Sequence, residues 1–198
     1  MRIFLSGPSG VGKSTIISAI LGKNRDLVLS ISYTTRPPRR MEIEGKDYFF
    51  ITRQQFEEMI EKDAFLEWAH VHNHLYGTSI SWVESTELAG KHILFDIDVQ
   101  GVGQAQEKGS PGCYIFIIPP SMDELRSRLD KRGTEDEFTM KTRLDNARQE
   151  LTAWKRYDFL VVNDNIETAI KDIQSIIDAC RCSKTEAIKR LPWLLKIA

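Results

Sequence analysis

The sequence is poor in cysteine and lacks the spacings that mark a disulfide framework or a zinc site. It has three cysteines, Cys113, Cys180 and Cys182. Their number is odd and none has a Cys-x-x-Cys partner, so we expect free thiols. Three histidines alternate at 70, 72 and 74, but no carboxylate or thiolate accompanies them at a recognised spacing. We interpret them as the polar face of a strand that runs into a loop, and not as a zinc site.

The sequence also lacks a long apolar run and an excess of either charge. No uninterrupted apolar run approaches the ~20 residues of a membrane span, and the N-terminus shows no signal-peptide pattern. The formal net charge is -1, from 27 basic and 28 acidic residues. We therefore predict a cytoplasmic protein without a nucleic-acid or membrane partner. A chain of 198 residues suits one globular domain with an insertion.

Residues 7–14 read Gly-Pro-Ser-Gly-Val-Gly-Lys-Ser, which is the spacing of a phosphate-binding loop. The apolar run 1–5 before it predicts a buried strand, and the spacing of apolar residues over 14–21 predicts a helix. In that setting the loop amides and the positive end of the helix hold phosphates. Lys13 is then expected to reach the β- and γ-phosphates, and Ser14 to bind Mg²⁺. The alternative, a glycine-rich corner, requires neither this spacing nor the Lys-Ser pair.

A second basic segment follows a predicted strand over 28–32. Residues 33–40 read Tyr-Thr-Thr-Arg-Pro-Pro-Arg-Arg. The prolines end regular structure, and guanidinium groups with hydroxyls suit a second anionic group. By itself this segment is more typical of a solvated basic turn.

The segment that begins near residue 47 has a different pattern of short strands and helices, which predicts a small lobe inserted into the nucleotide-binding fold. We expect strands near 47–51 and over 65–71, helices over 54–61 and 80–88, and a turn over 74–79.

The main fold then resumes with an apolar strand over 93–98 that ends in Asp96 and Asp98. One carboxylate is expected to serve Mg²⁺ and the other the substrate, although capping of the following helix is an alternative for one of them. Buried strands over 114–118 and 159–163, a capping-box pattern at 121–124 and an amphipathic helix over 166–182 follow. Alternating strands and helices predict an α/β fold, with a parallel sheet covered on both faces.

A charged segment beyond Gly133 contains Lys141, Arg143 and Arg148. Mixed charge of this kind indicates either a solvated helix face or a lid whose arginines close over phosphates. The C-terminal tail has enough apolar residues to pack somewhere, but the pattern does not say where.

A phosphate loop is compatible with an ATPase, a GTPase switch, a kinase or a transporter subunit. The Asn-Lys-x-Asp pattern that reads guanine in GTPase switches is absent. A second anion site, a carboxylate at Glu67 and a basic segment favour a phosphoryl transferase that brings two phosphorylated ligands together.

Several motifs in one order now identify a resemblance. They are 7–14, 32–39, 44–48, 67–69, 76–78, 96–101, 132–135, Arg143 and 162–164. Together they resemble guanylate kinase, of the nucleoside monophosphate kinase family of P-loop proteins, along all but the last dozen or so residues. Two departures are Leu75, where the family often has tyrosine, and the 184–198 tail, to which we can assign no counterpart in the family.

The resemblance implies a P-loop NTPase-type sheet with an inserted α+β lobe and a helical lid. It implies Mg²⁺-dependent transfer of the γ-phosphoryl group of ATP to GMP or dGMP, giving ADP and GDP, by a monomer or homodimer. The implied parts are a core (1–32 and 91–182), a lid (about 128–150), a GMP lobe (33–90) and a tail (183–198).

The resemblance also implies roles for single residues. ATP would be bound by Gly7, Pro8, Ser9, Gly10, Val11, Gly12, Lys13, Ser14 and Thr15. GMP would be bound by Ser32, Arg36, Arg39, Tyr48, Glu67, Tyr76, Thr78 and Asp98. The expected catalytic residues are Lys13, Arg36, Arg128, Arg132 and Arg143. Mg²⁺ would be held by Ser14, with Asp96 as a candidate contact through water.

Elementary chemistry agrees with the assignment of Glu67. A carboxylate accepts the N1–H and N2–H₂ donors of guanine, whereas adenine has an unprotonated N1. AMP, UMP or dTMP as acceptor is therefore disfavoured. A second alternative is a scaffold module that resembles guanylate kinase and only binds phosphorylated partners, but such modules usually lack the phosphate-loop lysine, which is present here as Lys13.

Overall fold

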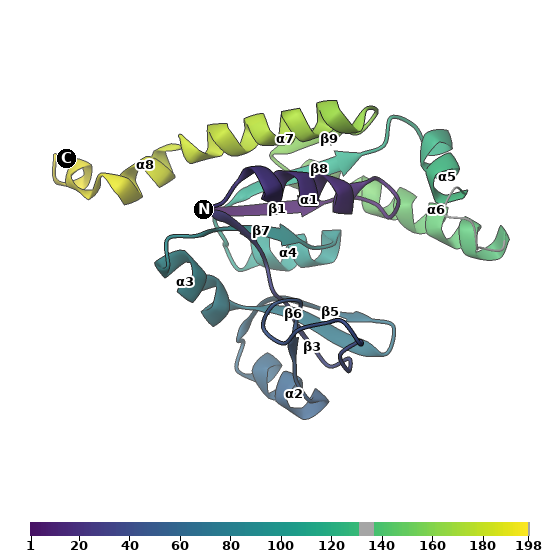
Figure 1. Ribbon diagram of the computed structural model, residues 1–198, viewed down its shortest axis with the longest axis horizontal. Helices are drawn as coiled ribbons and strands as arrows, with labels where there is room; N and C mark the ends of the chain where they lie inside the picture. Colours follow the sequence, from purple (N-terminus) through teal and green to yellow (C-terminus); the bar gives the residue numbers. More distant parts are fainter. Residues whose placement is uncertain (131–136, 198) are drawn as a thin grey trace.

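The chain forms a large parallel sheet and a smaller mixed sheet, as seen in a computed structural model that describes residues 1–130 and 137–197. The five strands of the large sheet are β2 (Leu27–Leu29), β7 (His92–Asp96), β1 (Arg2–Ser6), β8 (Cys113–Ile118) and β9 (Phe159–Val162), in that order. All of their pairings are parallel. Figure 1 shows this sheet at the centre of the molecule. The predicted α/β fold is confirmed.

Helices cover both faces of the large sheet. One face packs against α1 (Lys13–Lys23) and α7 (Ile166–Arg181), where Ile3 and Leu5 of β1 are fully buried. The other face packs against α3 (Ile80–Leu88) and α4 (Val99–Glu107). Phe4 points to that face and stacks between Phe95 and Tyr114, with ring centroids 4.4 and 4.5 Å away. Apolar residues on both sides of a strand are what a two-sided parallel sheet requires.

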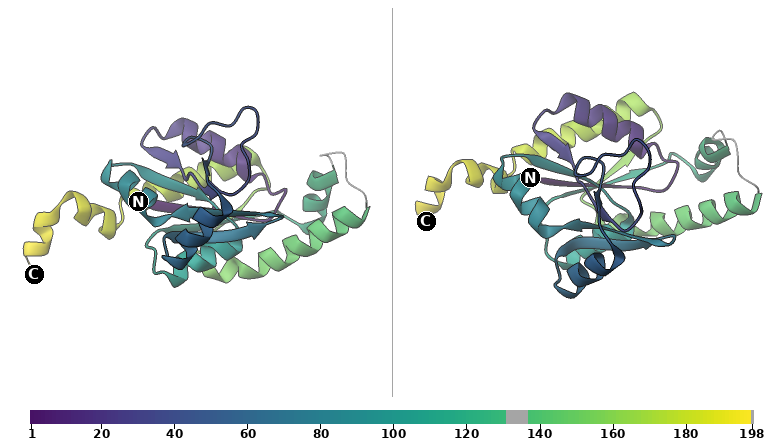
Figure 2. Two further views of the ribbon diagram at one scale, coloured as in Figure 1. Left: turned by 90° about the horizontal axis from the view of Figure 1, so that it is seen from below. Right: turned by 60° about the horizontal axis from the view of Figure 1, so that its bottom comes forward.

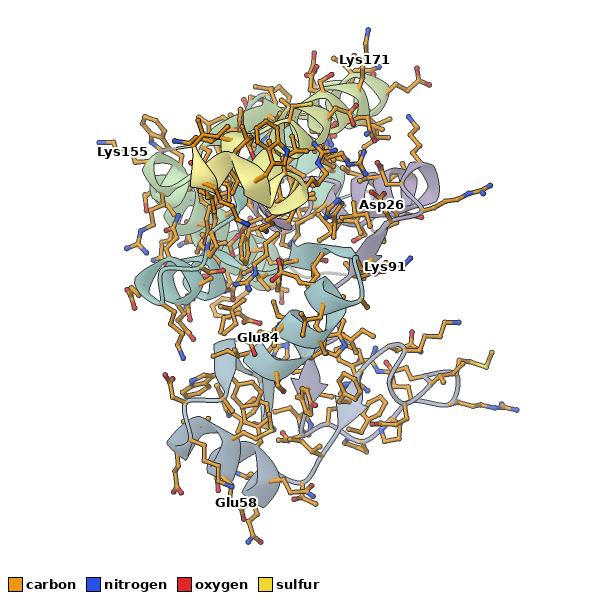
Figure 3. All side chains as sticks on the ribbon, turned by 90° about the vertical axis from the view of Figure 1, so that its left-hand side faces the viewer. Asp26, Glu58, Glu84, Lys91, Lys155 and Lys171 are labelled. Carbon is orange, nitrogen blue, oxygen red and sulfur yellow. The ribbon has the colours of Figure 1, made fainter. Side chains whose placement is uncertain are left out.

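The small sheet has the order β4 (Phe49–Phe50), β3 (Tyr33–Thr34), β6 (His74–Ser79) and β5 (Phe65–Val71). Together with α2 (Arg53–Glu61) it forms a lobe with its own core of Phe56, Phe65 and Leu75. Thr52 and Gln55 form a reciprocal capping box at the start of α2. Figure 3 shows α3, labelled at Glu84, between this lobe, labelled at Glu58, and the layer of α7, labelled at Lys171.

The turn predicted over 74–79 is wrong, because those residues form β6. The chain reverses at residues 72–73, where His72 has a φ of 53°, and β6 then pairs antiparallel with β5. Gly77 lies inside β6, where it serves a close approach within the sheet. A Cβ at Gly77 would lie 2.8 Å from Cβ of Trp68.

Two segments project from opposite ends of the molecule (Figures 1 and 2). On one side are α5 (Met122–Asp130) and α6 (Glu137–Leu151), followed by the 3₁₀ helix η1 (Thr152–Arg156). On the other side are α8 (Lys184–Arg190) and the 3₁₀ helix η2 (Pro192–Lys196). Apolar side chains of that tail, including Trp193 and Leu195, are exposed. In the described part of the chain, no helix combines the length and apolarity needed to cross a membrane.

The capping pattern at the start of α5 is half formed. The Ser121 hydroxyl accepts a hydrogen bond from the backbone N–H of Glu124 at 3.1 Å. The Glu124 carboxylate accepts a hydrogen bond from Arg128 Nε at 2.7 Å, one turn along the helix. The side chain that completes a capping box is thus committed to an i,i+4 ion pair.

Candidate active site

The phosphate loop connects β1 to α1 at the carboxyl edge of the large sheet. Its glycines are required by space and by backbone conformation. A Cβ at Gly7 would lie 2.5 Å from the carbonyl oxygen of Ile117. Gly12 precedes α1 with a φ of 95°, and a Cβ there would lie 2.6 Å from Nδ2 of Asn163. The loop is therefore packed tightly against the ends of two neighbouring strands.

Asn163 fixes the loop from the end of β9. Its side chain is buried, and Nδ2 donates a hydrogen bond of 2.7 Å to the carbonyl oxygen of Val11. This contact joins residues 152 positions apart in the chain. A buried amide with a backbone partner holds the loop in one conformation.

The loop encloses a cavity of about 260 Å³ that contains acidic as well as basic groups. The lining residues are Gly7, Pro8, Ser9, Gly10, Gly12, Lys13, Ser14, Asp98 and Glu150. Lys13 Nζ lies 3.0 Å from Oδ1 of Asp96 at the end of β7. Both are in position at the carboxyl edge of the sheet, where ligands of open α/β folds bind.

The oxygen groups around Lys13 suit Mg²⁺. The Ser14 hydroxyl is on an exposed residue, and Asp96 and Asp98 present carboxylates at the same edge. In the described residues no three His, Cys, Asp or Glu side chains are arranged to enclose a metal ion. Mg²⁺ in nucleotide sites is normally held by one or two protein groups, phosphates and water, so these residues fit it.

A buried carboxylate marks the second part of the site. Glu67 of β5 has an exposed fraction of 6%, and Oε1 accepts a hydrogen bond of 2.6 Å from the Thr78 hydroxyl of β6. Burial raises the pKa of Glu67 to about 7, an effect that Asp98 reinforces and Thr78 opposes. A Cβ at Gly101 would lie 3.1 Å from Glu67 Oε2, so glycine leaves the space that this carboxylate occupies.

The basic segment 33–40, called the arginine loop from here on, brings Arg36 close to two tyrosines of the lobe. Arg36 Nε donates to the Tyr76 hydroxyl at 3.1 Å, and its guanidinium lies 5.2 Å from the ring centroid of Tyr48. Both Nη atoms donate to the carboxylate of Glu42, at 2.8 and 2.9 Å. The backbone N–H of Arg39 also donates to Glu42, at 2.8 Å. The Arg36 guanidinium lowers the pKa of Glu42 to about 2, so this brace stays charged at neutral pH.

Two of the other predicted GMP residues are placed less specifically. The Arg39 side chain is exposed, and Ser32 is half-buried where its carbonyl oxygen accepts a hydrogen bond from Phe49 at 2.9 Å.

Asp98 lies between the two parts of the site. Its Oδ1 accepts hydrogen bonds from the backbone N–H groups of Gln100 and Gly101, at 3.0 and 2.8 Å, and so caps α4. Capping, which the sequence left open for one of the two aspartates, is therefore one role of Asp98. The same side chain lines the phosphate-loop cavity and its charge acts on Glu67. Asp98 thus connects the phosphate-loop cavity to the lobe.

The α5–α6 segment brings arginines to the phosphate loop. Arg143 Nη2 donates to the Ser9 hydroxyl at 2.9 Å, across 134 residues of sequence. Arg128 Nη1 donates to the carbonyl oxygen of Asn163 at 2.9 Å, in addition to its ion pair with Glu124. Arg148 pairs with Asp145 on the exposed side of α6. The helix therefore has both a site-facing and a solvated arginine, and Arg132 lies outside the described residues.

Sequence patterns missed two acidic residues of the site and the role of one amide. Glu42 follows Arg39 by three residues, a spacing that could have indicated a partner for the arginine loop. Asn163 was part of a motif, but its bond to Val11 depends on strand order. Glu150 is one acidic residue in a helix of mixed charge, and nothing in its sequence context distinguishes it. Burial and the charge of Asp98 raise the pKa of Glu150, the charge of Lys13 lowers it, and the net shift is upward.

A phosphate loop, a facing lobe with a buried carboxylate and a helix that brings arginine to the loop define a P-loop enzyme that transfers phosphoryl groups. The family model described as guanylate kinase matches residues 1–180. The chain belongs to the guanylate kinase family.

Individual relatives extend this result. The sequence is 47% identical to a guanylate kinase of Caldanaerobacter subterraneus, over 92% of this chain and 88% of that one. It is 43% identical to a guanylate kinase of Halalkalibacterium halodurans, over 100% of this chain and 97% of that one. A crystal structure of guanylate kinase from Anaplasma phagocytophilum superimposes with a TM-score of 0.68 at 31% identity. The match covers 93% of this chain and 87% of that one. The resemblance extends further than the motifs indicated, because the Halalkalibacterium match covers the whole chain, including the tail to which the motifs assigned no counterpart.

Proposed function

We propose that this guanylate kinase binds ATP on residues 7–15 and GMP or dGMP on the lobe, and transfers the γ-phosphoryl group between them to give ADP and GDP. The observation that carries the base assignment is the buried Glu67 beside Thr78. A carboxylate in this position accepts the N1–H and N2–H₂ donors of guanine, and a base without them leaves the charge unpaired. Discrimination of this kind reaches roughly 10⁴-fold.

The roles of the remaining residues follow from charge and position. Arg36, Arg39, Tyr48 and Tyr76 hold the GMP phosphate, since the guanidinium of Arg36 and both tyrosines converge there. Thr78 orients Glu67, and Ser32 and Asp98 border the base. The division into core, lobe, lid and tail remains the one predicted from sequence, and it is supported by the separation of the strands into two sheets.

Catalysis rests on positioning and charge, because the transferred group needs no covalent intermediate on the enzyme. Lys13 neutralises the β- and γ-phosphates. Arg143, already at the loop through Ser9, and the arginines Arg128 and Arg132 stabilise charge that develops on the transferred group. Mg²⁺, when bound through Ser14 and with Asp96 beyond a water, supplies Lewis-acid stabilisation of the phosphate oxygens. A cytoplasmic location and a monomeric or homodimeric state stay predictions.

A coupled assay of ADP release across GMP, dGMP, AMP, UMP and dTMP tests this function. We expect turnover with the guanine nucleotides and at most traces with the others. Equal turnover of AMP and GMP would contradict the guanine assignment. In the same assay Glu67→Gln should raise the KM for GMP at least about tenfold with little change for ATP, because one acceptor of the base is replaced by a donor. A matched rise for both substrates would remove Glu67 from the acceptor site.

A further inference from the structure

Helix α6 carries a carboxylate into the phosphate-loop cavity. Glu150 lies seven residues after Arg143, which is about two helical turns, so both side chains leave the same face of α6. Arg143 reaches Ser9 of the loop, and Glu150 lines the cavity together with Lys13, Ser14 and Asp98. One helix face therefore presents a cation and an anion to the place where phosphates bind.

The carboxylate of Glu150 needs an explanation, because a carboxylate in a phosphate-binding cavity repels the phosphates. Glu150 is half-buried and makes no hydrogen bond or ion pair to any residue that the structure describes. Lys13, the cation that lines the same cavity, is already 3.0 Å from Asp96. Glu150 and Asp98 thus form an acidic wall opposite the loop. Glu150 is half-buried and Asp98 is exposed, and two carboxylates at this wall favour an anionic ligand only when a cation lies between the carboxylates and the ligand.

The surroundings of Glu150 and Asp98 favour water over direct metal contact. The described residues contain no group of three side chains able to enclose a metal ion. The hydroxyls of Ser6 and Tyr157 are buried close to this pair, and neither has a hydrogen bond of good geometry within the described chain. Buried hydroxyls without a partner suit ordered water, and these two lie behind the residues that line the cavity. Mg²⁺ keeps several of its waters when it accompanies a nucleotide.

We infer that Glu150 is a positioning residue for the nucleotide-bound divalent cation, accepting hydrogen bonds from the cation's water shell together with Asp98. The inference rests on the proposed Mg²⁺-dependent function. It gives α6 two tasks on one face, with Arg143 acting on phosphate charge and Glu150 orienting the hydrated cation. Groups that orient metal-bound ligands in this way typically change metal affinity by about 10- to 100-fold.

Calorimetric binding of ADP, with Mg²⁺ and with EDTA, tests the inference in the full chain. For Glu150→Gln we expect the gain in ADP affinity on adding Mg²⁺ to fall about tenfold relative to the unmodified chain. In EDTA the variant should bind ADP as tightly or more tightly, because one repulsive charge has gone. In activity assays the Mg²⁺ concentration for half-maximal rate should rise, while the KM for GMP stays within about twofold.

Asp145→Asn is the matched control, since it removes the same charge from the exposed side of α6. It should leave all of these quantities unchanged. Glu150→Asp keeps the charge and should recover part of the Mg²⁺ effect, and circular dichroism checks that each variant folds. An unchanged Mg²⁺ effect in Glu150→Gln, or an equal loss of ADP affinity with EDTA, would overturn the inference. If Mg²⁺ does not strengthen ADP binding in the unmodified chain, the proposed metal dependence itself fails.

Discussion

Thr78 donates a hydrogen bond of 2.6 Å to Glu67, and the two residues lie on adjacent strands, β6 and β5, of the lobe. This contact compensates in part for the burial of the carboxylate, whose pKa is still raised to about 7. The free enzyme therefore holds Glu67 near the midpoint of its titration at neutral pH. A ligand that donates hydrogen bonds to the charged form completes the compensation.

The raised pKa of Glu67 predicts how GMP affinity depends on pH. In the proposed site Glu67 accepts both guanine donors only when it is ionised, so affinity should rise with pH up to about 7 and then level off. Thr78→Val removes the hydrogen bond that opposes the shift, which moves the rise to higher pH. The Kd for GMP between pH 5.5 and 9 measures this, and comparison of the two proteins cancels the titration of GMP itself. Superimposable profiles would contradict it.

The same shift predicts a trend in stability. Folded Glu67 titrates near 7 and the unfolded residue near 4.5, so the folded state binds more protons between these values. The contribution of Glu67 to stability is therefore greatest below about pH 4.5 and is lost as the pH rises to about 7, by at most about 3 kcal/mol. The difference in unfolding free energy between the unmodified chain and Glu67→Gln, measured by urea denaturation from pH 5 to 8, should change in this direction. A constant difference would exclude it.

Lys13 should be essential for turnover and dispensable for folding. Lys13→Ala removes the cation that faces the β- and γ-phosphates, and we expect kcat to fall at least about 100-fold. Circular dichroism should be unchanged, because the side chain is partly exposed and pairs only at the cavity edge. Lys23→Ala, at the exposed end of α1, is the control and should keep full activity. Retained activity in Lys13→Ala would mean that the loop is only structural.

The two arginines of α6 should differ in how strongly their loss lowers kcat. Arg143→Ala removes the guanidinium that reaches Ser9, and we expect kcat to fall at least about 100-fold. Arg148→Ala breaks only a surface ion pair with Asp145, which is worth at most about 1 kcal/mol. Steady-state kinetics of both variants distinguish a lid from a solvated helix face. Similar small effects in both would favour the solvated face.

Asn163 should act on ATP through the shape of the loop. Asn163→Ala removes the donor to the Val11 carbonyl, so we expect a higher KM for ATP and a loss of about 1–2 kcal/mol in unfolding free energy. Asn165→Ala is a matched control, because Asn165 caps α7 and its loss costs about 1 kcal/mol without touching the loop. An unchanged KM for ATP in Asn163→Ala would show that Asn163 stabilises the fold without affecting ATP binding.

Most of the fold could be predicted because local patterns control local structure. The apolar spacing of 80–88 predicted a helix that the structure contains with the same bounds, and the same holds for the strand 65–71. The prediction failed at 74–79, where the structure has a strand that contains Gly77 in place of the predicted turn. Its reason for being glycine is contact with Trp68 of the neighbouring strand, which no local pattern contains.

The sequence by itself determined the phosphate loop and the basic segment 33–40, because both depend on residue types at fixed spacing, and the family resemblance added Glu67 as the predicted contact of the base. Only the tertiary structure decided how these parts are held. Asn163 reaches Val11 because β9 and β1 run parallel in one sheet and end at the same edge, and Arg143 reaches Ser9 because α6 passes the loop. The bracing of Arg36 by Glu42, the burial that shifts the pKa of Glu67 and the position of Glu150 in the cavity likewise depend on three-dimensional packing. Hydrogen bonds and desolvation act over a few ångströms, and the fold alone brings such distant residues to that distance.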